Sequence, residues 1–327
     1  MIISRTPLRV SFFGGGSDLP AYYRRHGGAV LSAAIDKSVY VTVSRKFDDA
    51  VRVSYSRTEE VAHASKVEHP LVREALGLLN IGGGIEITSV ADIPASGTGL
   101  GSSSSFTVGL LNALYAHSGR MASAATLAKE SCHIEIERCG EQIGKQDQYA
   151  AAHGGFNFIR FNPDDSVEVK KAICPPGMLD RLQQNLLFFY TGLTRSASAL
   201  LQRQSSDVGK PGAKSDATGA LVRLAETAFE QICAGNISSF GPLLDEAWQL
   251  KRSLTDGISN NLIDDAYDAA RKAGAEGGKV LGAGGGGFMM FYAHPERHTA
   301  IRQAMASLRE THFAFSPEGS KIIFVHQ

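Results

Sequence analysis

The segment from Asp92 to Phe106, DIPASGTGLGSSSSF, combines residue types that bind an anion. Its glycines allow main-chain N–H groups to converge, and its four consecutive serines add hydroxyl donors. The apolar run VGLLNALYA follows, so the serines should open a helix whose first turn has unpaired N–H groups and a positive dipole end. We therefore predict a phosphate site here, the alternative being a flexible linker with a serine N-cap. The expected contact residues are Gly97, Gly99, Leu100, Gly101, Ser102, Ser103, Ser104 and Ser105.

The spacing of this segment excludes three common motifs. No Lys-Ser or Lys-Thr pair follows the glycines, as a Walker A loop would require. The glycines read GxGxG, not the GxGxxG of a dinucleotide-binding fold. The GxSxG elbow of lipases is also missing from the segment.

Two further glycine runs could line the same ligand cleft. Seven of the twelve residues from Gly277 to Phe288 are glycine, far more than a tight hairpin needs, so something must pack against this backbone. We expect it to form a second wall of the cleft, with Gly284 and Gly285 facing the ligand. The other run, Gly14 to Gly16, follows a strand that Arg9 interrupts, and Asp18 ends it. Either charge is a functional residue or an ordinary surface residue.

An acidic segment from Glu135 to Asp147 offers a catalytic base. Asp147 stands just before the apolar residues AAAHGGF, and burial tunes the basicity of a carboxylate, so Asp147 is the general-base candidate. Glu141 reads as a helix-surface charge. His294 and His298 lack the HExxH pattern and are interpreted as surface residues without a metal role.

Strand and helix patterns place these motifs between secondary-structure elements. In the first half we expect strands at 7–13, 29–35, 39–47, 51–55, 85–90 and 156–161, and helices at 69–79, 103–117, 123–138 and 142–152. In the second half we expect strands at 186–190, 278–282, 287–292, 312–316 and 321–325, and helices at 196–206, 216–234, 238–251, 260–274 and 295–310. Strands and helices mix without regular alternation, which predicts two α+β domains. Turn signals place the boundary near residue 180, giving domains 1–180 and 181–327.

Composition narrows the class of partner. The 327 residues hold 33 basic and 33 acidic side chains, so no net field favours nucleic acid or an anionic membrane, and small-molecule partners are expected. No stretch is apolar enough to span a bilayer, and no signal peptide is recognised. The four cysteines form no CxxC pair, which is typical of a cytoplasmic protein with core thiols.

Three motifs in order resemble the GHMP kinase superfamily, the group of galactokinase, homoserine kinase and mevalonate kinase. They are PLRV through GGGSD at 7–18, GLGSS at 99–103 and GAGGGGF at 282–288. The blocks GKQDQYAAAHGGFNF at 144–158 and YTGLTRSAS at 190–198 are most similar to the bacterial D-glycero-D-manno-heptose 7-phosphate kinases. The resemblance covers the whole chain. It implies an N-terminal domain like ribosomal protein S5 domain 2 and a ferredoxin-like C-terminal domain, with the active site between them.

The resemblance also implies roles for individual residues. Mg-ATP would phosphorylate the anomeric hydroxyl of heptose 7-phosphate to the 1,7-bisphosphate, a step in nucleotide-activated heptose synthesis for surface polysaccharide. Asp147 would take or orient the hydroxyl proton, and Arg9 would steady charge on the phosphoryl group. The serine loop would hold the triphosphate, with Ser103 and Glu137 as Mg²⁺ contacts and Glu135 as the fallback if the helix register shifts.

On the acceptor side, a carboxylate accepts two hydrogen bonds from a diol, so Asp18 is expected to bind sugar hydroxyls. Galactokinases have a Glu-His pair where this chain has Gly15 and Gly16, which would leave room for a bulkier sugar phosphate. The expected cations for the 7-phosphate are Arg195, Lys145 and Lys251.

Other functions are compatible with the same motifs. Another GHMP kinase, acting on fucose or a different hexose, is the nearest alternative, and a non-catalytic sugar sensor on the same fold is the second. A nicotinamide-dependent oxidoreductase fails on motif spacing. The sequence leaves open the adenine contacts, the product anomer and the oligomeric state, for which a homodimer is one option.

Overall fold

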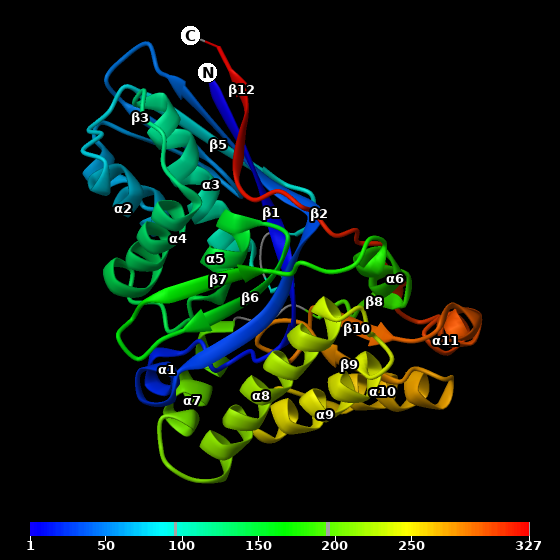
Figure 1. Ribbon diagram of the computed structural model, residues 1–327. Coiled ribbons are helices and arrows are strands. Elements are labelled where there is room, and N and C mark those ends of the chain that lie inside the picture. Colours follow the sequence, from blue (N-terminus) through cyan, green and yellow to red (C-terminus); the bar gives the residue numbers. More distant parts are fainter. Residues whose placement is uncertain (95–96, 194–196, 327) are drawn as a thin grey trace.

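The computed structural model describes residues 1–94, 97–193 and 197–326. Over these residues it forms two sheets flanked by helices (Figure 1). The first sheet has the order β12-β1-β2-β5-β3-β4, with β6 also paired to β2 and β7 paired to β6. Its strands are β1 (Ile2–Phe13), β2 (Gly28–Arg45), β3 (Val51–Ser54), β4 (Thr58–Val61), β5 (Ile85–Ala91), β6 (Phe156–Phe161), β7 (Val167–Lys171) and β12 (Lys321–Val325).

Helices of the first half pack against this sheet, and α3 makes the most extensive contact with β1 and β2. Its apolar residues from Val108 to Leu114 are nearly all buried, which explains why this run forms a core helix. The helices are α1 (Pro20–His26), η1 (Ala64–Lys66), α2 (Pro70–Leu78), α3 (Ser102–His117), α4 (Ala124–Cys132), η2 (His133–Arg138), α5 (Gln146–His153) and α6 (Met178–Gln184).

The second sheet, in the order β11-β8-β10-β9, is antiparallel throughout and has helices α8, α9 and α10 beside it in Figure 1. Its strands are β8 (Leu186–Tyr190), β9 (Gly277–Val280), β10 (Phe288–Tyr292) and β11 (Arg309–Glu310). The helices are α7 (Ala197–Val208), α8 (Ala213–Cys233), α9 (Phe240–Ser253), α10 (Asn261–Lys272), η3 (Pro295–Arg297) and α11 (His298–Ala304). The mixed α+β architecture is as expected.

Differences from the expected elements have local causes. The two strands expected at 29–35 and 39–47 form the single strand β2. The register of its pairing with β1 shifts at residues 35–37, and β1 pairs with β2 on both sides of this irregularity. The helix expected at 142–152 begins only at Gln146, after Gly140 and Gly144. The helix expected at 295–310 is shorter, and the strand expected at 312–316 is reduced to one bridge between Ile35 and Phe315. The helices α1 and α6 and the strands β4 and β7 were missed.

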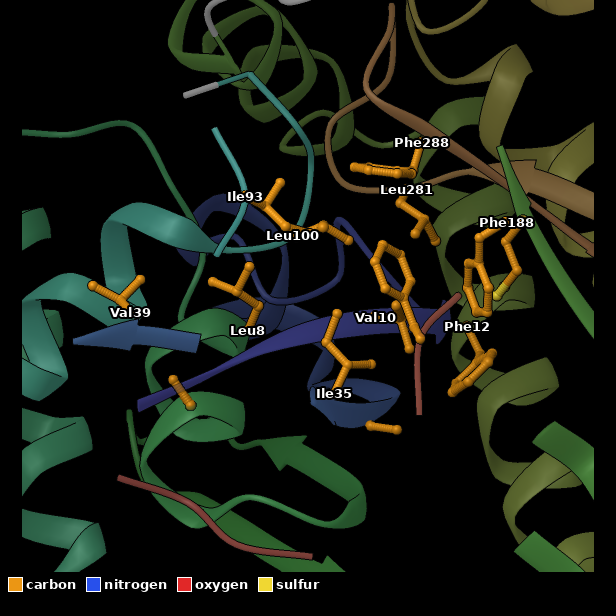
Figure 2. Packing of buried hydrophobic residues seen from close by; sticks show 14 of the residues in the cluster. Leu8, Val10, Phe12, Ile35, Val39, Ile93, Leu100, Phe188, Leu281 and Phe288 are labelled. Carbon is orange, nitrogen blue, oxygen red and sulfur yellow. The ribbon is translucent and has the colours of Figure 1, made fainter. Parts of the chain in front are cut away.

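The chain ends return to the same sheet. Strand β12 pairs with β1, so the two termini lie together at one end of the molecule in Figure 1. Division at residue 180 would therefore assign β12 to the second domain although its hydrogen bonds join the first sheet. A continuous apolar cluster also links the halves: Val10 and Phe12 of β1 pack near Phe188 and Phe288 of the second sheet (Figure 2).

Among the described residues, no helix is both long and apolar enough to cross a membrane.

Candidate active site

A cavity of about 540 Å³ lies between the two halves of the chain. Its walls come from the loop after β1, the loop before α3, the start of α5, helix α9 and the glycine run between β9 and β10. All three glycine runs singled out in the sequence thus meet at one place. The lining includes three cations, Arg9, Lys251 and Lys279, and three carboxylates, Asp18, Asp147 and Glu141. Glu141, expected as a helix-surface charge, is exposed but lies in the loop before α5 and not on a helix.

The glycine run before α3 and the run between β9 and β10 touch through their backbones. A Cβ atom on Gly99 would lie 2.3 Å from the carbonyl oxygen of Leu281, and one on Gly282 would lie 2.6 Å from Cα of Gly99. Side chains are therefore excluded at this contact, as the glycine content suggested. Leu100 and Leu281 leave the two loops and enter the shared apolar cluster beside Val10 (Figure 2). This packing anchors both loops to β1.

Helix α3 points its N-terminal turn at the cavity. Its N-cap is Gly101, with φ +77°, and no side chain among the described residues caps the helix. The first N–H groups of an uncapped helix lack intrahelical partners, which suits an anion. Ser102 and Ser104 are buried, Ser103 is exposed, and all three line the cavity. Ser105 is different: its buried hydroxyl donates to the carbonyl of Pro7 at 2.8 Å, so it holds α3 to β1 and does not face the ligand.

Arg9 and Asp147 form an ion pair with two hydrogen bonds in the wall of the cavity. Nε of Arg9 donates to Oδ1 of Asp147 at 2.7 Å, and Nη2 donates to Oδ2 at 2.6 Å. Nη1 of Arg9 also donates to the carbonyl of Gly99 at 2.6 Å, which ties the pair to the glycine loop. The Arg9 side chain is only 5% exposed, whereas Asp147 keeps 24% of its side chain open to the cavity. The arginine thus fixes the orientation of an accessible carboxylate.

Glu135 lies beneath the serines of α3 and is fully buried. Its carboxylate accepts hydrogen bonds from Ser104 at 2.8 Å, from Thr107 at 3.0 Å and from Ser103 at 3.2 Å, and also from the amide of Gln148. Burial, together with the negative charge of Asp147, raises the pKa of Glu135 to about 7, although these hydrogen bonds lower it. The residue belongs to η2, which is a π-helix, and such turns are frequent at functional sites.

We predict that Glu135→Gln gains stability relative to the wild type as pH rises. The carboxyl group has an ordinary pKa of 4.5 and a folded pKa of about 7, so its contribution to stability is full below pH 4.5 and is lost as pH rises through 7. The uncharged amide has no such loss, and the difference should grow by about 1 to 3 kcal/mol between pH 4.5 and 8. Urea unfolding in EDTA at several pH values measures it. A difference independent of pH would contradict the buried charge.

Asp18 is buried in the wall of the cavity beside the start of α5. Its carboxylate accepts N–H bonds from Gly16 at 3.0 Å and Gln146 at 3.3 Å, and burial raises its pKa. The room expected beside it is present at Gly15, where an added Cβ would have no neighbour closer than 3.8 Å among the described residues. At Gly16 the space is filled, because an added Cβ would lie 2.2 Å from Nε2 of Gln204.

Lys251 lines the cavity as expected. Lys279, which sequence reasoning missed, also lines it. Lys251 Nζ donates to the carbonyl of Gly15 at 3.1 Å. Lys279 Nζ donates to the carbonyls of Ser11 and Phe12 at 2.9 and 3.0 Å. One signal could have found it, because Lys279 is the only charged residue between Gly277 and Phe288.

Several expected ligand contacts are not brought to the cavity. Glu137, expected at Mg²⁺, is 69% exposed and bonds to His133 at 2.7 Å, because the π-turn directs Glu135 inward instead. Lys145 bonds to Asp165 at 3.0 Å outside the cavity lining. Gly284 lines the cavity, but Gly285 does not and instead donates its N–H to the carbonyl of Ile258. Arg195 lies outside the described residues.

The chain matches two family models. Residues 57–155 match the N-terminal domain of the GHMP kinases, and residues 228–311 match their C-terminal domain. These ranges contain the serine loop, Glu135, Asp147, Lys251 and Lys279.

Relatives and solved structures agree with these matches. The chain is 27% identical to the D-glycero-alpha-D-manno-heptose 7-phosphate kinase of Campylobacter jejuni, over 98% of each chain. It is 25% identical to a bifunctional fucokinase/GDP-fucose pyrophosphorylase of Arabidopsis thaliana over 91% of its own length, which spans 30% of that longer protein. A D-glycero-D-manno-heptose 1-phosphate kinase from Bacteroides thetaiotaomicron aligns over 100% of both chains with a TM-score of 0.82 and 25% identity.

Proposed function

The chain belongs to the GHMP kinases and is an ATP-dependent sugar kinase, and from this premise we propose that it phosphorylates the anomeric hydroxyl of D-glycero-D-manno-heptose 7-phosphate. The observation that carries the proposal is the place of the Arg9 and Asp147 pair. Arg9 bonds to the carbonyl of Gly99 in the loop before α3, which suits the phosphates of ATP, and Gln146, next to Asp147, bonds to Asp18, which suits a sugar. Two compared proteins, by their names, act on heptose phosphates.

The proposed mechanism relies on positioning and charge neutralisation. The open carboxylate of Asp147 accepts the proton of the attacking sugar hydroxyl. Arg9 keeps that carboxylate oriented through two hydrogen bonds and places positive charge beside the phosphoryl group in transit. Main-chain N–H groups from Gly101 to Ser104 hold the triphosphate at the helix N-terminus.

The oxygens of Ser103 and Glu135 fit a magnesium ion. Within the described parts of the chain, no group of three or more His, Cys, Asp or Glu side chains could hold a metal. Mg²⁺ usually takes one or two protein oxygens plus substrate phosphates, and the Ser103 hydroxyl beside the Glu135 carboxylate supplies such a pair. When bound, the ion would neutralise charge on the phosphates.

Replacing Ser103 by alanine should raise the Mg²⁺ concentration required for half-maximal activity severalfold while leaving sugar affinity nearly unchanged. The substitution removes one oxygen assigned to the metal without touching the Asp18 side of the cavity. A Mg²⁺ titration at saturating sugar measures it, and Ser105→Ala serves as the control because that hydroxyl bonds to Pro7. An unchanged Mg²⁺ requirement would show that Ser103 does not contact the metal.

The proposed substrate is tested by ADP release across a panel of acceptors. The panel should contain heptose 7-phosphate, heptose 1-phosphate, unphosphorylated heptose, fucose and galactose. Highest kcat/KM with heptose 7-phosphate, with the product phosphorylated at the anomeric oxygen, would support the proposal. Preference for fucose or galactose would replace it with a hexose kinase, and no sugar-dependent ADP release would indicate a non-catalytic sugar sensor.

A further inference from the structure

In the described parts of the chain, two buried lysines stand in the cavity without carboxylate partners. Lys251 on α9 and Lys279 on β9 are each 6% exposed, and both line the cavity. Over the described residues, neither amine takes part in an ion pair with a carboxylate. A buried cation is costly unless something compensates it, so this arrangement suits an anion that enters from outside.

Each amine has donor capacity left for such an anion. An ammonium group has three donors. Lys279 uses two on the carbonyls of Ser11 and Phe12, and Lys251 uses two on Gly15 and on Oε1 of Gln204. One N–H remains on each lysine, counted over the described residues.

Unsatisfied polar atoms gather at the same place. The hydroxyl of Ser11 and Nε2 of Gln204 are buried and have no hydrogen-bond partner in the described structure. Both residues contact the lysines, since Ser11 binds Lys279 through its carbonyl and Gln204 binds Lys251 through its amide oxygen. Buried polar groups are normally paired. The two lysine amines, the Ser11 hydroxyl and the Gln204 amide are therefore four donors that a ligand with several oxygens could satisfy.

We propose that Lys251, Lys279, Ser11 and Gln204 form a subsite for the phosphate monoester that the sugar acceptor already carries. The inference rests on the proposed function, since it gives a binding site to the phosphate group at the far end of the acceptor sugar. A phosphate monoester offers three oxygens and two negative charges, which match two cations and two neutral donors. The subsite borders Gly15 and Gly16, on the acceptor side of the Arg9 and Asp147 pair.

The charges around the subsite favour an anion when it is empty. Burial, together with repulsion by Lys251 and Arg9, lowers the pKa of Lys279 to about 7. Burial lowers the pKa of Lys251 to about 8, against the attraction of Asp18. A bound dianion would restore the ordinary preference of both amines for the charged form. Affinity for the phosphorylated acceptor should therefore fall as pH rises from 7 to 9.

The test compares Lys279→Met and Lys251→Met with the wild type on heptose 7-phosphate and on unphosphorylated heptose. We expect kcat/KM for the phosphorylated sugar to fall about 10- to 150-fold in each variant, the scale of a charge-assisted hydrogen bond. Unphosphorylated heptose and the KM for ATP should change less than threefold. Lys46→Met is the control for loss of a lysine away from the cavity, because Lys46 is half-buried and is paired with Asp48.

Binding measured without ATP or Mg²⁺ separates affinity from catalysis. Calorimetric titration of heptose 7-phosphate should show the same loss of affinity in both lysine variants. If a methionine variant fails to fold, Ser11→Ala tests the subsite without changing its charge, and it should weaken heptose 7-phosphate severalfold more than unphosphorylated heptose.

The outcomes distinguish the subsite from the proposed function. Equal losses on both sugars, or a raised KM for ATP, would overturn the subsite, while a wild-type preference for heptose 7-phosphate would leave the proposed function standing. If the wild type prefers another phosphorylated acceptor, the proposed substrate fails. The subsite then stands only if the lysine variants lose that acceptor selectively.

Discussion

Asp147→Asn is expected to lower turnover by about a hundredfold to ten-thousandfold while ATP and sugar still bind. Asparagine has nearly the same shape as aspartate, so it can keep one hydrogen bond from Arg9. It removes the carboxylate that is bonded to Arg9 and is partly open to the cavity, and with it the proton acceptor. Steady-state ADP release with heptose 7-phosphate, together with calorimetric binding of both substrates, measures the effect.

A matched control separates proton transfer from helix stability. Asp147 stands in the first turn of α5, where a negative charge also stabilises the helix dipole. Asp180 stands in the first turn of α6 and is exposed. Asp180→Asn should therefore show the small change in thermal unfolding that loss of a helix-dipole charge alone causes, with near-normal turnover. Near-normal turnover in a folded Asp147→Asn variant would refute the role of base.

Arg9 and Asp147 should also behave as a unit. Because one side chain orients the other, losing Arg9 removes part of what Asp147 contributes. The double variant Arg9→Gln with Asp147→Asn should thus lose much less activity than the product of the two single losses.

The sequence predicted the fold class and most elements because their apolar residues repeat with clear periods. Strands β6 and β12 have the expected bounds, and α3 differs by one residue. Elements without such a repeat were missed: β7 alternates charged residues at the surface, and α1 is a short helix that begins at Pro20. The length of β2 was underestimated because Asp36 and Lys37 resemble a turn, although pairing with β1 carries the strand through them.

The sequence predicted those parts of the candidate site in which a high glycine content indicates that two backbone segments lie close together. It was less informative where the direction of a side chain decides which residue faces the ligand. The meeting of the glycine loops follows from residues that admit no Cβ, such as Gly99 and Gly282. The choice between Glu135 and Glu137 depends on a π-turn, which no spacing in the sequence reveals. Lys279 was missed because its neighbours Gly277 and Gly278 suggested backbone packing and not a ligand group.

Gly99→Ala should have the second large effect, because it separates the two glycine loops. The added Cβ would lie 2.3 Å from the carbonyl oxygen of Leu281, and the contact is with backbone, which cannot move aside as a side chain can. The carbonyl of Gly99 also holds Arg9, so a shift of this loop displaces the Arg9 and Asp147 pair. A displacement of about 1 Å is enough to lower kcat/KM about a hundredfold. The free energy of unfolding should fall by about 2 to 4 kcal/mol from overpacking and backbone strain together.

Gly119→Ala isolates the backbone part of that effect. Gly119 follows α3 with φ +70°, close to the +77° of Gly99, but a Cβ there would meet no described atom within 4 Å. The two substitutions therefore impose similar left-handed strain, and only Gly99→Ala adds a collision. Gly119→Ala should lose about 1 kcal/mol of stability and keep normal kcat/KM. Equal losses in the two variants, by urea unfolding and ADP release, would show that strain alone acts and that the contact between the loops does not position the catalytic pair.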